Sequence, residues 1–153
     1  MPRQRPTQQP DLLSWQPPKA VESFEADVVR ASSIAGKIAR GLSQALKDCD
    51  MPRTEIAQRM SDYLGETVSA NMLNAYASEA REEHRINLLR FVGLLHATRD
   101  RRLLELIAGM FGWTVIDRKY LPLIELAAIR EKTDELSRQA EAVRRRARGE
   151  GVI

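Results

Sequence analysis

Apolar residues recur at steps of three and four along most of this chain, the spacing that gathers them on one face of an α-helix. Between Ala20 and Gly112 the pattern divides into five helices, one in 20–50, a pair in 52–81, and one each in 86–98 and 100–112. In the last of these, Leu104, Met110 and Phe111 are expected to face inward. Residues 113–116 favour an extended segment that covers the core. The sequence therefore predicts an all-α domain over residues 21–118.

The pair of short helices in the middle of the chain is bounded by local signals. Pro52 suits the start of the first helix, and Gly65 suits its end because glycine adopts the left-handed conformation common after a helix. Ser69 can cap the second helix through its hydroxyl, and Val68 is placed to pack on Leu73. Such a pair is the arrangement of a helix-turn-helix, although any helical bundle also contains one.

A last helix is predicted within residues 119–153, with Pro122 in its first turn. Its apolar positions alternate in steps of three and four at Leu126, Ile129, Thr133, Leu136, Ala140, Val143 and Ala147. This heptad pattern predicts a two-stranded coiled coil in a homodimer. The dimer contacts would be made by the large apolar residues Leu126, Ile129, Leu136 and Val143. The threonine and the alanines weaken the seam, and the alternative is a lone amphipathic helix lying on its own domain.

Residues 1–20 hold five of the seven prolines and four glutamines, so a disordered arm is predicted because it cannot bury enough apolar surface to fold. Leu12, Leu13 and Trp15 form an apolar island, which docks on a partner or folds back on the domain. The run Gln9, Pro10, Asp11, Leu12, Leu13 resembles the peptide by which bacterial replication proteins bind the sliding clamp. That resemblance implies an alternative function, a non-catalytic adaptor that recruits a replication or transposition protein.

The composition limits the class of protein. A length of 153 residues suffices for one ordinary domain with extensions. The single Cys49 excludes an internal disulfide framework and fits a reducing compartment. No apolar run approaches the roughly 20 residues of a membrane helix, and the first residues lack the apolar core of a signal peptide. These features predict a cytoplasmic protein.

The sequence contains few of the residue patterns that are typical of an enzyme's active site. The two histidines, His84 and His96, do not stand at a metal-ligand spacing with each other or with Cys49. No glycine-rich motif that would cradle a phosphate group occurs. The sequence therefore predicts a protein without catalytic activity, bound metal or cofactor.

The five predicted helices, with the pair at the second and third positions, resemble the helix-turn-helix domain of phage repressors. This resemblance implies that the third helix enters the major groove of double-stranded DNA while the second crosses the backbone. Asparagine amides on such a helix can hydrogen-bond adenine, and arginines can reach phosphates. The predicted DNA contacts are Ser69, Asn71, Asn74, Ser78, Arg81 and Arg85, with Arg53 and Arg59 from the preceding helix.

Two features depart from the repressor pattern. The spacing from Ala57 to Gly65 is several residues longer than usual, and acidic residues crowd the end of the reading helix at Glu79, Glu82 and Glu83. Because phosphate neutralisation supplies most non-specific affinity, this face alone would bind DNA weakly. The arginines that crowd the C-terminal end, Arg144, Arg145, Arg146 and Arg148, add phosphate contacts or mark a solvated helix end favoured by the helix dipole.

The order of segments is similar to a protein encoded with the transposition and early genes of Mu-like transposable phages and prophages. The matching phrases are a WQPP-bearing arm, EIAQRMSDYLG, VSANMLNAYASEAREEHRINLLRFVGLLHAT, GWTVIDRKYLPLIELA and a charged final helix. The most specific parts lie at residues 76–83 and 120–126. The resemblance implies a DNA-binding accessory or regulatory protein that acts in the bacterial cytoplasm, at the nucleoid.

Overall fold

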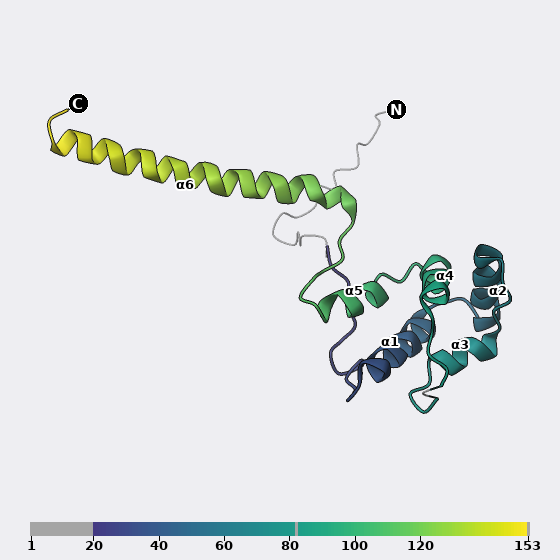
Figure 1. Ribbon diagram of the computed structural model, residues 1–153. Coiled ribbons are helices and arrows are strands. Elements are labelled where there is room, and N and C mark those ends of the chain that lie inside the picture. Colours follow the sequence, from purple (N-terminus) through teal and green to yellow (C-terminus); the bar gives the residue numbers. More distant parts are fainter. Residues whose placement is uncertain (1–19, 82, 153) are drawn as a thin grey trace, which may run out of the picture. The chain divides into compact units, whose positions relative to one another are not determined.

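The computed structural model describes residues 20–81 and 83–152, so the predicted docking residues 9–15 lie outside the described residues. All regular structure in the described part is helical, and it contains no β-strand. In chain order the elements are α1 (Ile34–Asp48), α2 (Arg53–Leu64), α3 (Ala70–Tyr76), α4 (Leu88–Thr98), α5 (Arg102–Gly109), the 3-10 turn η1 (Arg118–Tyr120) and α6 (Leu121–Gly149) (Figure 1). The prediction of an all-α protein is confirmed.

The chain divides into two compact units between Val115 and Ile116, a few residues before the boundary that the sequence suggests. The N-terminal unit contains α1 to α5, and the C-terminal unit contains η1 and α6.

The first helix is shorter than predicted. It begins late because the Ser33 side chain accepts a hydrogen bond from the backbone N–H of Gly36 (3.0 Å) and caps the helix there. Residues 20–33, predicted as the start of a long helix, contain no helix. Phe24 anchors this segment by packing against the core. Tertiary packing and the serine cap therefore outweigh the helical spacing of its apolar residues.

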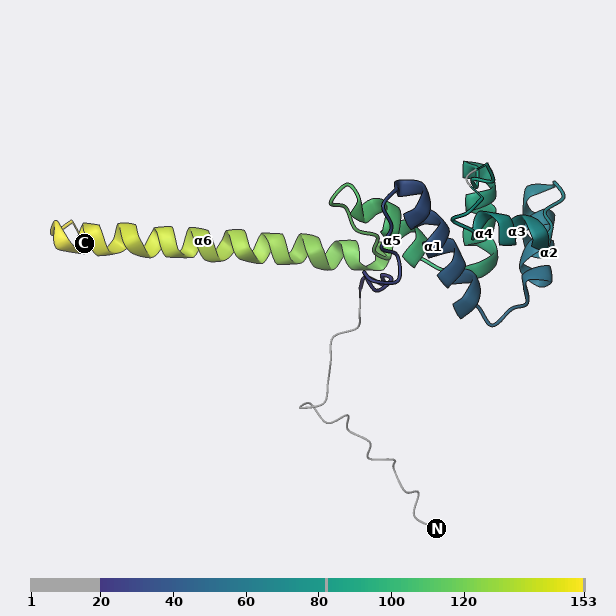
Figure 2. The same cartoon turned by 90° about the horizontal axis from the view of Figure 1, so that it is seen from below.

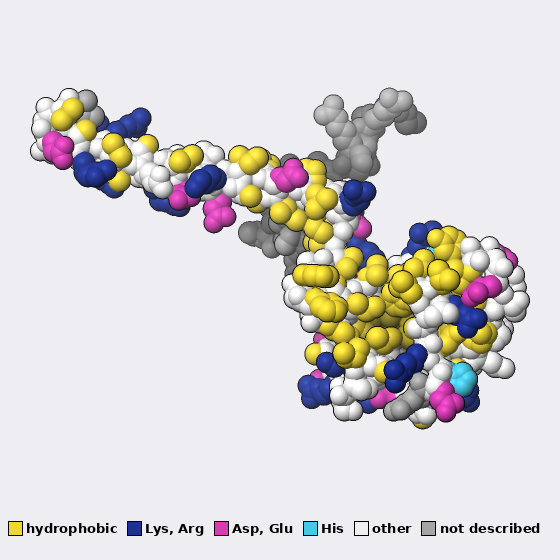
Figure 3. All heavy atoms as spheres, in the orientation of Figure 1, with side chains coloured by type: hydrophobic (Ala, Val, Ile, Leu, Met, Phe, Trp, Pro, Cys, Tyr) yellow, Lys and Arg dark blue, Asp and Glu magenta, His cyan; other side chains and the backbone are white. Residues whose placement is uncertain are grey.

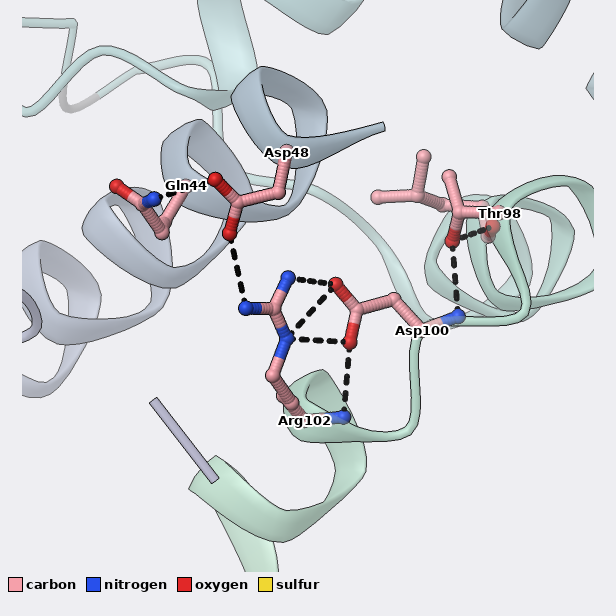
Figure 4. A network of polar contacts seen from close by, with 6 residues as sticks. Gln44, Asp48, Thr98, Asp100 and Arg102 are labelled. Carbon is pink, nitrogen blue, oxygen red and sulfur yellow. Dashed lines mark hydrogen bonds and ion pairs between the residues drawn. The ribbon is translucent and has the colours of Figure 1, made fainter. Parts of the chain in front are cut away.

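Arg102, in the first turn of α5, joins three parts of the N-terminal unit (Figure 4). Its guanidinium group forms ion pairs with Asp100 (2.6 Å) and with Asp48 at the end of α1 (2.8 Å), and it lies 4.4 Å from the centre of the Phe24 ring. The hydrogen bond with Asp100 raises the pKa of Arg102, against a smaller lowering by desolvation. A raised pKa keeps this stabilising charge present at every pH below the ordinary pKa of arginine.

The local signals around the helix pair are confirmed. Gly65 ends α2 in the left-handed conformation (φ 70°), and the Ser69 side chain accepts a hydrogen bond from the backbone N–H of Met72 (3.2 Å) at the start of α3. The turn is also tied to α2, because the hydroxyl of Ser61 accepts a hydrogen bond from the backbone N–H of Val68 (2.9 Å). These two contacts fix the start of α3 and the turn that leads into it.

Six large side chains are fully buried and come from every helix of the N-terminal unit: Leu42, Ile56, Met60, Leu73, Leu94 and Leu103. Two glycines bring neighbouring helices close together. A Cβ atom at Gly93 would lie 2.7 Å from Cδ1 of Leu64, and one at Gly41 would lie 2.6 Å from Cδ2 of Leu106. Side chains of α2 and α5 thus occupy the space next to the backbones of α4 and α1.

Part of the predicted core is exposed. Leu104, Met110 and Phe111 are all exposed, although the sequence placed them inside. Trp113 is 70% exposed and stacks on Phe111 (5.4 Å between ring centres), so the predicted cover over the core is wrong at this residue. The segment is held instead by the carboxylate of Glu105, which accepts the backbone N–H of Val115 (2.7 Å). Figure 3 shows apolar side chains gathered on the face that carries α5.

The C-terminal unit is dominated by one unbroken helix of 29 residues, α6 (Figure 2). Pro122 lies in its first turn, as predicted. None of its side chains is buried.

No helix in the described part of the chain combines the length and the apolar character needed to cross a membrane.

Candidate nucleic-acid interface

Helix α3 exposes the two asparagines that the sequence singles out. Asn71 and Asn74 are exposed, whereas Leu73 and Tyr76 on the other side of the helix are buried, as is Ala75, which lies one turn after Asn71 and borders the exposed face. Within the described residues the Asn71 side chain makes no hydrogen bond, so both its amide donor and its acceptor are open to a ligand.

Asn74 is already oriented by a neighbouring helix. Its side-chain oxygen Oδ1 accepts a short hydrogen bond from Nη1 of Arg53, the first residue of α2. An amide oxygen has two lone pairs, so one remains for a base, and the amide NH₂ group has no partner among the described residues. The Arg53 contact therefore fixes the amide without using up its hydrogen-bonding capacity.

Ser69 has a structural role. Its hydroxyl oxygen caps α3 by accepting from Met72, which leaves its O–H donor and one acceptor lone pair for a ligand. Arg59 lies elsewhere. It pairs with Glu55 (2.8 Å) and borders a groove between α2 and α4 together with His96. In that groove the ring of His96 stacks on a tyrosine of α2 at 3.8 Å. The structure thus separates Arg59 from the outward face of α3.

The remaining predicted contacts do not lie on α3. The helix ends at Tyr76, so Ser78, Arg81 and Arg85 belong to the loop between α3 and α4. These three residues line a groove of about 420 Å³ together with Ser33 at the start of α1. The sequence expectation of a reading helix that reaches Ser78 is wrong, because α3 closes with a short turn in which Ser78 donates its backbone N–H to Ala75 (3.2 Å).

Two acidic residues near the helix pair form ion pairs within the N-terminal unit. Glu79, expected to repel phosphates, pairs with Arg40 of α1 (2.5 Å). Glu66 in the turn pairs with Arg90 of α4 (3.0 Å). Arg90 also donates a short hydrogen bond to the hydroxyl of Tyr76, and this bond raises the pKa of Arg90 more than any other contact. Several arginines of the N-terminal unit are therefore paired with carboxylates of the same unit.

The ion pairs of Arg40 and Arg90 could not be predicted from the sequence. They join residues 39 and 24 positions apart in the chain, on elements whose packing is not encoded in local spacing. Each of the two arginines forms an ion pair with a carboxylate near the helix pair and so reduces the negative charge there.

The arginines at the end of α6 form a contrasting group. Arg144, Arg145, Arg146 and Arg148 are exposed, and none of them makes an ion pair within the described residues. Figure 3 shows basic side chains near this end of the helix. The large residues of the predicted seam are exposed as well, with exposed fractions of 42% to 62% for Leu126, Ile129, Leu136 and Val143.

Metal-binding clusters are not seen in the part of the chain that the structure describes, where no three His, Cys, Asp or Glu side chains are grouped to hold an ion.

Comparison of the chain with protein-family models, with curated protein sequences and with solved structures finds no match in any of the three.

Proposed function

We propose that this protein binds double-stranded DNA as a homodimer and serves as a non-catalytic accessory or regulatory protein of a Mu-like transposable phage or prophage, in the bacterial cytoplasm. The observation that carries the proposal is the exposure of Asn71 and Asn74 on α3, a short helix whose opposite side is buried. In this proposal α2, the turn and α3 form a helix-turn-helix of the repressor type, with α3 in the major groove.

The rigidity of α3 supports a role in base recognition. Its start is capped by Ser69, its approach is tied to α2 by Ser61, and its last turn is linked to α2 by Arg53. A side chain that reads a base edge must be held in position before binding, because ordering it during binding costs affinity. Asn74 meets this requirement through its contact with Arg53, whereas Asn71 is positioned only by the backbone of α3.

The charge distribution predicts weak non-specific binding by the N-terminal unit alone. Arg59 is paired with a carboxylate, and Arg53 is bonded to Asn74. Phosphate contacts are then left to exposed arginines such as Arg81 and Arg85, together with the end of α6. The homodimer, formed through the exposed seam of α6, doubles both the reading helices and the phosphate contacts.

Replacing Asn71 and Asn74 together by alanine should reduce specific binding. A good bidentate contact to a base contributes about 1–3 kcal/mol of discrimination, so the loss expected is roughly 5- to 150-fold for each asparagine that reads a base. A target duplex is first selected from a random pool with the full chain. Fluorescence anisotropy then compares the affinity for this duplex with that for a scrambled one at several salt concentrations.

Gln139→Ala is the matched control, since it removes an exposed amide from α6. Circular dichroism verifies that the double variant stays folded after losing the Arg53 contact. A double variant that keeps the wild-type ratio of selected to scrambled affinity would remove α3 from the proposal.

A further inference from the structure

No described residue of the C-terminal unit covers the seam of α6, although four of its positions carry large apolar side chains that are exposed. In heptad terms Leu126, Thr133, Ala140 and Ala147 occupy the a positions, and Ile129, Leu136 and Val143 occupy the d positions. The inference below rests on the proposed dimer, in which a second copy of α6 covers this seam.

We propose that the two copies of α6 pair antiparallel along their whole length, so that the arginine end of each copy lies beside the start of the other. The two-fold axis would cross the helices between Asp134 and Glu135. This point coincides with the middle of Leu121–Gly149 to within a residue, so the register overlaps both helices almost completely.

The size of the seam side chains favours this register. An antiparallel pair places each a position opposite a d position, which gives the layers Leu126–Val143, Ile129–Ala140 and Thr133–Leu136, each occurring twice. A larger side chain then faces a smaller one in every layer, which is how close-packed interiors are filled without voids. The small residues that weaken the seam are thus each matched by a larger residue of the second copy.

The parallel alternative packs the same residues poorly. Identical residues would face each other, so Ala140 would meet Ala140 and leave a gap between the layers of Leu136 and Val143. Parallel two-stranded coiled coils also favour β-branched residues at a and leucine at d. Here the β-branched Ile129 and Val143 stand at d and Leu126 stands at a, against that preference, whereas Thr133 at a and Leu136 at d follow it.

The charges beside the seam are also complementary in the antiparallel pair. Glu125 precedes the first a position and would face Arg146 of the second copy, and the symmetry repeats this attraction at the other end. The two arginine clusters are kept apart, whereas a parallel pair would crowd them together. Within the described residues Arg146 has no acidic partner on its own chain, so it is open to this contact.

At about 1.5 Å per residue, the starts of the two α6 helices in this pairing would lie about 40 Å apart, each beside the arginine end of the other copy.

Disulfide trapping tests the orientation. In full-length protein carrying Cys49→Ala, Leu126→Cys and Val143→Cys are made separately, and each variant is oxidised alone and after mixing. The antiparallel register predicts a cross-linked dimer only in the mixture, because position 126 faces position 143. The controls Ala128→Cys and Ala142→Cys, which lie off the seam, should not cross-link alone or mixed.

Each outcome of the trapping experiment has a separate meaning. Cross-linking of each single variant with itself would overturn the antiparallel orientation while leaving the dimer. Absence of any cross-link, together with a monomer mass in sedimentation, would overturn the dimer and this inference with it, but not DNA binding by α3.

Discussion

Leu136→Asn should convert the dimer into a monomer at concentrations where the wild-type chain is dimeric. Leu136 is 54% exposed on α6 and would become buried against the second copy. Burying one leucine contributes about 1.5–3 kcal/mol, and the substitution acts twice in a symmetric dimer. The dimer dissociation constant should therefore rise by a factor on the order of 100 or more. Sedimentation equilibrium over a range of concentrations measures this constant directly.

Ala142→Asn is the control for this experiment, since it places the same residue on the same helix but away from the seam. It carries the cost of asparagine in a helix without the loss of an interface contact. Equal dissociation constants for the two variants would show that the seam does not hold the dimer together.

Leu94→Ala should strongly destabilise the N-terminal unit. Leu94 is 1% exposed on α4 and belongs to the core cluster that also contains Ile56, Met60 and Leu73. Truncating such a leucine removes apolar burial and leaves a cavity, which costs about 3 kcal/mol and at times up to about 5. Urea unfolding followed by circular dichroism, at one fixed protein concentration, should show a clearly lower midpoint with an unchanged slope.

Leu88→Ala provides the comparison on the same helix. Leu88 is 76% exposed, so its truncation should change the free energy of unfolding by no more than about 0.5 kcal/mol. Similar losses in the two variants would contradict the burial of α4 against the rest of the unit.

The elements that the sequence predicts correctly are those with local causes. Ser69 caps α3 by accepting a backbone N–H three residues later, and Gly65 supplies the left-handed residue after α2. These effects depend on residues only a few positions apart, so they are visible in the sequence. The helix pair follows from them, the all-α class follows from the three- and four-residue spacing of apolar positions, and the exposure of Asn71 and Asn74 follows from their place opposite Leu73 and Tyr76.

The failures have non-local causes. Residues 20–33 show helical spacing, but Phe24 is drawn to the core and to Arg102 across the fold. The end of α3 and the exposed Phe111 likewise depend on how helices meet rather than on their periodicity. The ion pair between Arg40 and Glu79 reduces the negative charge near α3, and it could not be predicted because the two residues lie 39 positions apart in the sequence.

The close approach at Gly93 constrains the junction between α2 and the turn that follows it. Leu64, the last residue of α2, fills the space that any side chain at position 93 would need, and the next residue, Gly65, begins the turn into α3. A methyl group at position 93 would therefore force the Leu64 side chain to move. Under the proposed function, a residue that touches no ligand would thereby act on the segment from which the reading helix departs.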